Sequence, residues 1–145
     1  MSTTGIDSTA LDLASGIAAF ESREFRRASQ LLSPLAQIGN AEAQYRMAII
    51  LQNGLGTPEN KDQAMQWMKA AAEQGQAMAQ HGLGFMYLEG DSIEKNPLLA
   101  MQWFQLAATQ GMTGSMACIG RMYEDGLGVG QDDAMAKKWY KRAGF

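Results

Sequence analysis

The sequence predicts an all-α protein of about eight helices arranged in antiparallel pairs. Three tryptophans, Trp67, Trp103 and Trp139, lie 36 residues apart, and the residues around them repeat in the same frame. Apolar residues recur inside each repeat at helical spacings of three and four, with no alternating pattern of a β-strand. Glycines fall between and after the apolar segments, where helical hairpins turn.

Length and composition fit one folded domain. The chain has 145 residues, of which 46% are hydrophobic and 19% charged. The net charge of −3 leaves no broad basic face, which argues against nucleic acid as a partner. No apolar run approaches the roughly 18 residues of a membrane span, so no membrane insertion is expected.

Other absences in the sequence narrow the function further. One cysteine, Cys118, and one histidine, His81, cannot form an intramolecular disulfide or a zinc site. We therefore expect no metal, no cofactor and no catalytic residue. The N-terminus has neither the basic start nor the apolar stretch of a signal peptide, which predicts a cytoplasmic protein. The location would be periplasmic or secreted if an export signal had been removed.

The repeats divide the chain in order. Residues 41–75, 76–111 and 112–145 form three copies, and residues 8–40 form a weaker one. Terminal repeats are commonly atypical because one face meets water. We expect the whole of 1–145 to fold as a single solenoid domain.

In the weaker N-terminal copy, the stretch 14–36 predicts a hairpin with a tight turn at Ser22–Glu24. Ala28 and Gly39 lie 36 residues before Ala64 and Gly75. These matches place the segment in the repeat frame.

Each later copy predicts two helices joined by a longer corner. The first helix of the second copy carries an apolar stripe at helical spacing, formed by Ala43, Met47, Ala48 and Leu51. The second helix carries Ala64, Trp67, Met68, Ala71 and Ala72. Gly75 and Gly111 follow the second helices, where glycine favours the left-handed cap. Asn60, Asn96 and Asp132 precede them as predicted N-caps, and Pro97 fits a first turn.

The corners "NGLGTPEN" (53–60) and "DGLGVGQD" (125–132) look like phosphate-binding loops. Such loops follow a strand, whereas these recur at the bend of each helical hairpin. The middle corner, "EGDSIEKNP", keeps Gly90 and loses the second glycine, and one glycine suits a turn with positive φ. We interpret all three corners as structural turns.

The repeated order A-x-A-Q, G, Y, G-x-G, A, W, A-A and Q-G resembles the Sel1-like repeat, a relative of the tetratricopeptide repeat. Three units match, from Ala41 to Phe145, although Ser115 and Met116 replace the A-Q pair of the last unit and its terminal Q-G is missing. Residues 8–40 are similar to a degenerate tetratricopeptide repeat. The resemblance implies a right-handed superhelical solenoid of α/α hairpins. It also implies a non-catalytic adaptor, because members of the family commonly serve bacterial signalling, envelope assembly and host interaction.

The resemblance places a partner-binding groove on the concave face of the superhelix. That groove is lined by first-helix residues outside the apolar stripe, which by frame are Glu42, Tyr45, Ile49, Gln52, Met78, His81, Phe85, Leu88, Arg121 and Glu124. Ile49, Phe85 and Leu88 are large and apolar although the hairpin stripe does not need them. A groove for a protein or peptide explains them, and so does packing against a neighbouring unit or the N-terminal segment.

Two other functions stay open. A hydrolase acting on cell-wall material would need a cluster such as His–carboxylate or Ser–Lys, and the sequence shows none. Self-assembly into a homo-oligomer would use the C-terminal end face, where Trp139, Tyr140 and Phe145 are apolar.

Overall fold

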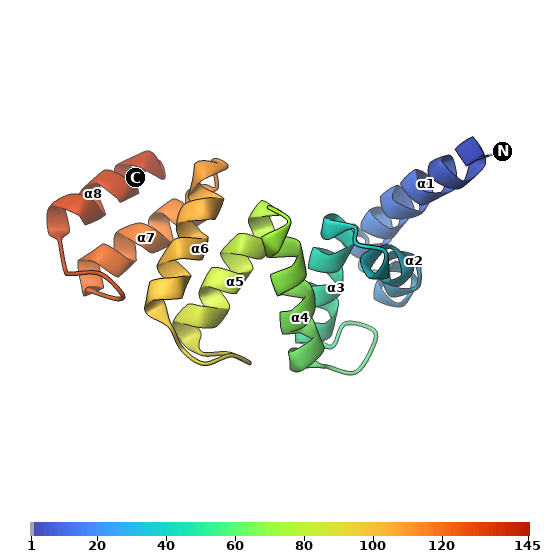
Figure 1. Cartoon of the computed structure of the whole chain (residues 1–145), viewed down its shortest axis with the longest axis horizontal. Coiled ribbons are helices and arrows are strands. Elements are labelled where there is room, and N and C mark those ends of the chain that lie inside the picture. The colour runs from blue at the N-terminus through green and yellow to red at the C-terminus, as the bar shows by residue number, and fades with distance from the viewer. Residues whose placement is uncertain (1) are drawn as a thin grey trace. The chain divides into compact units, whose positions relative to one another are not determined.

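The computed structural model describes residues 2–145, with side chains from Ser8 onward. Over this range the chain forms eight α-helices packed in consecutive pairs, which confirms the predicted all-α fold (Figure 1). The helices are α1 (Ser2–Glu21), α2 (Phe25–Gln37), α3 (Ala41–Asn53), α4 (Lys61–Glu73), α5 (Ala77–Glu89), α6 (Pro97–Thr109), α7 (Thr113–Asp125) and α8 (Asp133–Arg142).

The helices group into two compact units. The first holds α1 to α4 and ends at Gln76, and the second holds α5 to α8 from Ala77 onward. The tight turn between α1 and α2 spans Ser22–Glu24, as predicted. A continuous solenoid domain over 1–145 stays a prediction.

Side-chain caps begin the second helices as the sequence predicted. Asn60, Asn96 and Asp132 each accept a hydrogen bond from the backbone N–H three residues later, at 3.1 Å in all three cases. Pro97 occupies the first turn of α6. Asn40 caps α3 in the same way, at 2.9 Å, although it was not among the predicted caps.

Glycine ends the second helices in a left-handed conformation. Gly75 has φ +95°, its N–H donates to the Ala72 carbonyl, and the next N–H donates to the Ala71 carbonyl. Gly39 and Gly111 repeat this pair of hydrogen bonds. Gly144 also makes it, so α8 has a glycine cap despite the missing Q-G.

The A-Q and Q-G positions of the repeat meet in space. Gln44 is buried on α3, where its amide nitrogen donates to the Ala36 carbonyl at the end of α2, at 3.1 Å. Its amide oxygen accepts from Gln74 Nε2 at 2.8 Å. Gln80 and Gln110 form the equivalent amide pair at 2.9 Å. The buried glutamine therefore links the first helix of a repeat to the end of its second helix, and in the first unit also to the preceding repeat.

Both corner positions with glycines have positive φ. Gly54 and Gly56 have φ +63° and +69°, and the last corner is alike. In the middle corner Ser92 takes the second place at φ +63°. Gly90 has φ +74°, as expected for a glycine at this turn. The left-handed conformation of Ser92 was not expected, and it costs an L-residue about 1–2 kcal/mol relative to a right-handed conformation.

The predicted apolar stripes form the cores of both units. Ala43, Met47, Ala48 and Leu51 are all buried in the first unit, which confirms the stripe of α3. In the second unit Phe104, Ile119 and Met122 are fully buried. Small residues on the first helices admit the bulky residues of the second helices. A Cβ atom on Gly84 would lie 2.8 Å from the Phe104 ring, and one on Gly120 would lie 2.9 Å from the Tyr140 ring.

Candidate partner-binding site

The predicted groove residues lie on the first helices α3, α5 and α7, in two patches, one in each unit. The α3 patch consists of Glu42, Tyr45, Ile49 and Gln52. The α5–α7 patch consists of Met78, His81, Phe85, Leu88, Arg121 and Glu124. Each patch lies entirely within one unit.

The α3 patch is half-buried and its charges are paired. Arg46 Nε lies 3.1 Å from a Glu42 carboxylate oxygen, and Gln76 Nε2 donates to the other oxygen at 3.3 Å. The Arg46 guanidinium also lies over the Phe20 ring of α1, 4.8 Å from its centroid. Helix α1 therefore packs beside this patch, and the patch offers a partner little free charge.

Tyr45 provides a hydroxyl in the α3 patch. Burial raises the pKa of its phenol, with Arg46 opposing that change and Glu42 reinforcing it. The phenol is protonated at neutral pH and can donate a hydrogen bond to a partner.

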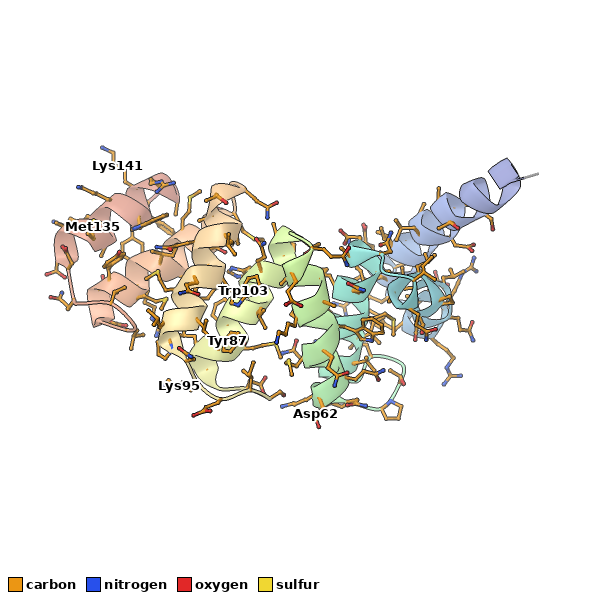
Figure 2. All side chains as sticks on the ribbon, viewed as in Figure 1. Asp62, Tyr87, Lys95, Trp103, Met135 and Lys141 are labelled. Carbon is orange, nitrogen blue, oxygen red and sulfur yellow. The ribbon has the colours of Figure 1, made fainter. Side chains whose placement is uncertain are left out.

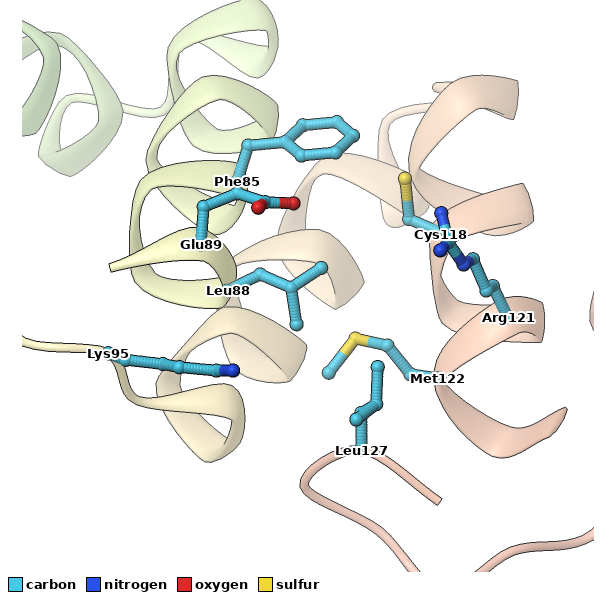
Figure 3. A pocket seen from close by; sticks show the side chains of 8 residues that line it. All are labelled: Phe85, Leu88, Glu89, Lys95, Cys118, Arg121, Met122 and Leu127. Carbon is cyan, nitrogen blue, oxygen red and sulfur yellow. The ribbon is translucent and has the colours of Figure 1, made fainter. Parts of the chain in front are cut away.

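The α5–α7 patch contains a cavity of about 180 Å³ (Figure 3). It is lined by Phe85, Leu88, Glu89, Lys95, Cys118, Arg121, Met122 and Leu127. The structure brings together three residues that the sequence predicted, namely Phe85, Leu88 and Arg121. It does not place Met78, His81 or Glu124 on the cavity wall.

Five wall residues were missed because the repeat frame considered only groove positions of the first helices. Lys95 and Leu127 belong to the corners, which were expected to be structural turns alone. Glu89 and Met122 are on α5 and α7 but off the groove frame. Cys118 is also on α7 and is half-buried at the cavity wall.

The cavity has an apolar floor and charged residues at its edge. Leu88, Met122 and Leu127 approach one another from two helices and a corner (Figure 3). Lys95 extends toward them from one side, and Arg121 stands on the wall opposite Phe85. Arg121 is exposed and lies 3.5 Å from Asp125, a contact worth at most about 1 kcal/mol.

Cys118 is a weakly reactive thiol. Burial raises the pKa of Cys118, while Arg121 opposes the shift. The protonated thiol predominates at neutral pH, so Cys118 contributes an apolar surface to the cavity.

Phe85 is exposed but firmly positioned. Its ring packs edge-on against Phe104, with centroids 5.4 Å apart, and against His81, with centroids 5.0 Å apart. Phe85 is 39% exposed and Met78 is 43% exposed. Large apolar side chains that are both exposed and rigidly held lose little conformational entropy when a partner covers them.

His81 Nδ1 lies 2.7 Å from Ser115 Oγ, which ties α5 to α7. This pair was not predicted from the sequence, although Ser115 replaces an alanine that the repeat frame gives at Ala43 and Ala79. Burial lowers the pKa of His81, so the ring is neutral at pH 7. Ser115 is fully buried, and its hydroxyl cannot reach a substrate carbonyl. The pair joins two helices and lacks the accessible nucleophile of a hydrolase.

The C-terminal residues proposed as a stacking face differ in exposure. Trp139 and Tyr140 are half-buried, and Phe145 is 83% exposed. The Arg142 guanidinium covers the Trp139 ring at 4.2 Å from its centroid. Self-assembly through this face stays a prediction.

The described residues form neither a metal cluster nor a membrane span. No three His, Cys, Asp or Glu side chains there come together as a metal site would require. Likewise, none of the helices described between residues 2 and 145 combines the length and apolarity of a membrane span.

Three stretches of the chain, 41–76, 77–112 and 115–144, match the Sel1 repeat. The crystal structure of a Sel1 repeat protein from Oxalobacter formigenes, 33% identical in sequence, superposes with a TM-score of 0.81 over 90% of this chain and 54% of its own. A protective antigen present in uropathogenic Escherichia coli strains, which displays an SLR fold, is also 33% identical. Its TM-score is 0.86 over 93% of this chain and 30% of its own.

A third structure, Helicobacter pylori cysteine rich protein B, is 18% identical and shows likeness of fold alone. Its TM-score is 0.63 over 83% of this chain and 86% of its own. No curated protein matches the sequence. The chain spans about half the length of the Oxalobacter protein and less than a third of the Escherichia antigen.

Proposed function

The chain belongs to the Sel1 repeat family, and on that premise we propose that it is a non-catalytic interaction module that binds a partner segment on its first helices. The three matched repeats confirm the resemblance that the sequence motifs indicated. Modules of this family are generally scaffolds for protein interaction, and the binding mode below is our proposal.

The observation that carries the proposal is the cavity between α5 and α7. Its volume of about 180 Å³ is below the roughly 300–1,000 Å³ of sites that enclose a small molecule or cofactor. A cavity of this size accommodates one apolar side chain of a partner. Phe85 at its wall is an aromatic residue of the type that most often becomes an interface hot spot.

The charges around the cavity would orient the partner rather than hold it. Arg121, Lys95 and Glu89 are exposed. Exposed charges add little affinity but select among partners and fix the direction of a bound segment. The partner is thus a peptide or helix with an apolar anchor and flanking polar residues.

A peptide-display selection on the immobilised full chain tests this proposal. Selected peptides are then titrated against wild type, Phe85→Ala and a matched control, Leu98→Ala, which truncates an exposed leucine of α6. Loss of the Phe85 ring should weaken peptide binding by ten-fold or more, and Leu98→Ala should leave binding unchanged. Peptides that bind Phe85→Ala as tightly as wild type would contradict the site.

The hydrolase alternative has weaker support because Ser115, the one hydroxyl bonded to His81, is buried. Release of soluble fragments from purified peptidoglycan by the wild type, abolished in His81→Gln, would revive it.

A further inference from the structure

The exposed stripe of α6 carries no charge. Its exposed positions follow helical spacing on one side of the helix and are Leu98, Gln102, Gln105, Leu106 and Thr109. Leu98 is 59% exposed and Leu106 is 48% exposed. The whole helix, Pro97–Thr109, contains no Asp, Glu, Lys or Arg.

The other second helices of the repeats are charged in the same frame. At the positions that match the α6 stripe by the 36-residue period, α4 exposes Asp62, Lys69 and Glu73, and α8 exposes Lys138, Lys141 and Arg142. Asp62 and Lys141 point away from their helices (Figure 2). The repeat fold therefore does not require an uncharged second helix, and α6 differs in a property that concerns its outer surface alone.

The pattern on α6 is nearly symmetric along the helix. Leu98 and Leu106 each lie four residues from Gln102, about 6 Å along the axis at 1.5 Å per residue. In an antiparallel pair of two such helices, a twofold axis through Gln102 would set Leu98 against Leu106 of the second copy. The stripe is thus complementary to itself.

Gln102 suits the position on that axis. A residue on the twofold axis faces the same residue of the second copy, so a Lys or Glu at this position would face a like charge. A side-chain amide carries both donors and an acceptor and can bond reciprocally with another amide. Helix α8 has Lys138 at this place in the frame, which would repel its copy.

We propose that the uncharged α6 stripe (Leu98, Gln102, Gln105, Leu106 and Thr109) is a self-association surface that pairs two copies of this chain antiparallel about Gln102. One helix face buries less than about 1,200 Å² in total, the range of weak, transient contacts. The pairing is therefore reversible and concentration-dependent. The stripe lies on α6 and shares no residue with the peptide site on α5 and α7, so the pairing and peptide binding can be tested separately.

Sedimentation velocity of the full chain from roughly 10 µM to 1 mM, the range suited to a weak contact, tests the pairing. Wild type should shift from monomer toward dimer, and Leu98→Asp and Gln102→Glu should each weaken association by ten-fold or more. Leu11→Asp, at an exposed leucine of α1, is the matched control and should associate like wild type. A wild type that stays monomeric over the whole range would overturn the proposal, and so would a dimer that Leu98→Asp leaves intact.

Disulfide trapping tests the register on a Cys118→Ser background. Gln102→Cys should cross-link to itself under mild oxidation. Leu98→Cys and Leu106→Cys should each cross-link slowly alone and readily when mixed, since the axis pairs one with the other. Self-cross-linking of Leu98→Cys at the rate of Gln102→Cys would exclude the antiparallel register.

Discussion

A Cβ atom added to Gly84 would lie 2.8 Å from the ring of Phe104, closer than side-chain carbons pack in a folded protein. Gly84 lies on α5 and Phe104 on α6, so the missing side chain lets the two helices of this hairpin close around the ring. The same frame positions hold Ala48 and Met68 in the preceding repeat. Residue size is therefore balanced across each hairpin.

Gly84→Ala should lower the free energy of unfolding by about 1–2 kcal/mol, because overpacking outweighs the gain in helix propensity. Adding Phe104→Met restores the pair found in the preceding repeat and should recover a large part of that loss. Urea unfolding of the two single variants and the double variant measures the coupling. Simple additivity of the two changes would show that the Gly84–Phe104 contact is not the cause.

Ser92→Gly should stabilise the protein by about 0.5–1 kcal/mol, because Ser92 has φ +63° and glycine adopts this conformation without steric cost. Urea unfolding gives the change, and Ser92→Ala serves as the control that should give no gain. A Ser92→Gly variant no more stable than wild type would mean that the corner carries no strain.

Gln74→Ala should lower the free energy of unfolding by about 1–3 kcal/mol, because it leaves the buried amide oxygen of Gln44 without its donor. Gln44→Met introduces the residue that the last repeat has at Met116. In the double variant with Gln44→Met, Gln74→Ala should lower the free energy of unfolding by less than it does in the wild type. Gln66→Ala, an exposed glutamine on α4, is a control expected to change stability little.

The pKa of His81 should lie below 6.5 in the folded protein, because burial disfavours the charged ring. The unfolded chain then binds more protons between the two pKa values, so stability falls as the pH drops below about 6.5. His81 is the only histidine, so its ring proton gives an unambiguous NMR titration. A titration midpoint at or above 6.5 contradicts the prediction.

The stability effect of His81 is isolated by comparison with His81→Gln. The urea midpoint of wild type should decrease more between pH 7.5 and pH 5 than that of the variant, with the difference arising from His81 alone. Equal decreases would assign the pH dependence to the carboxylates.

The repeat period made the helices and their caps predictable from sequence. Asn60, Asn96 and Gly75 have local roles, and a local role depends only on the residue and its place in the frame. The groove positions were inferred from the same frame, and the structure joins Phe85, Leu88 and Arg121 at one cavity.

Features that depend on contacts between repeats were not predictable in this way. His81 and Ser115 belong to successive repeats, and each looks unremarkable when its own repeat is considered alone. Lys95 and Leu127 come to the cavity from corners whose paths the periodicity does not determine. The positive φ of Ser92 was not predictable because a serine gives no sequence signal for a left-handed conformation.

Amide hydrogen exchange of the full chain, with and without a display-selected peptide, tests the central claim most directly. The account predicts that peptide binding slows exchange in the first helices, above all in α5 and α7 around Phe85 and Cys118. The exposed sides of α4, α6 and α8 should exchange at unchanged rates. Protection confined to α4, α6 or α8 would contradict the proposed binding face.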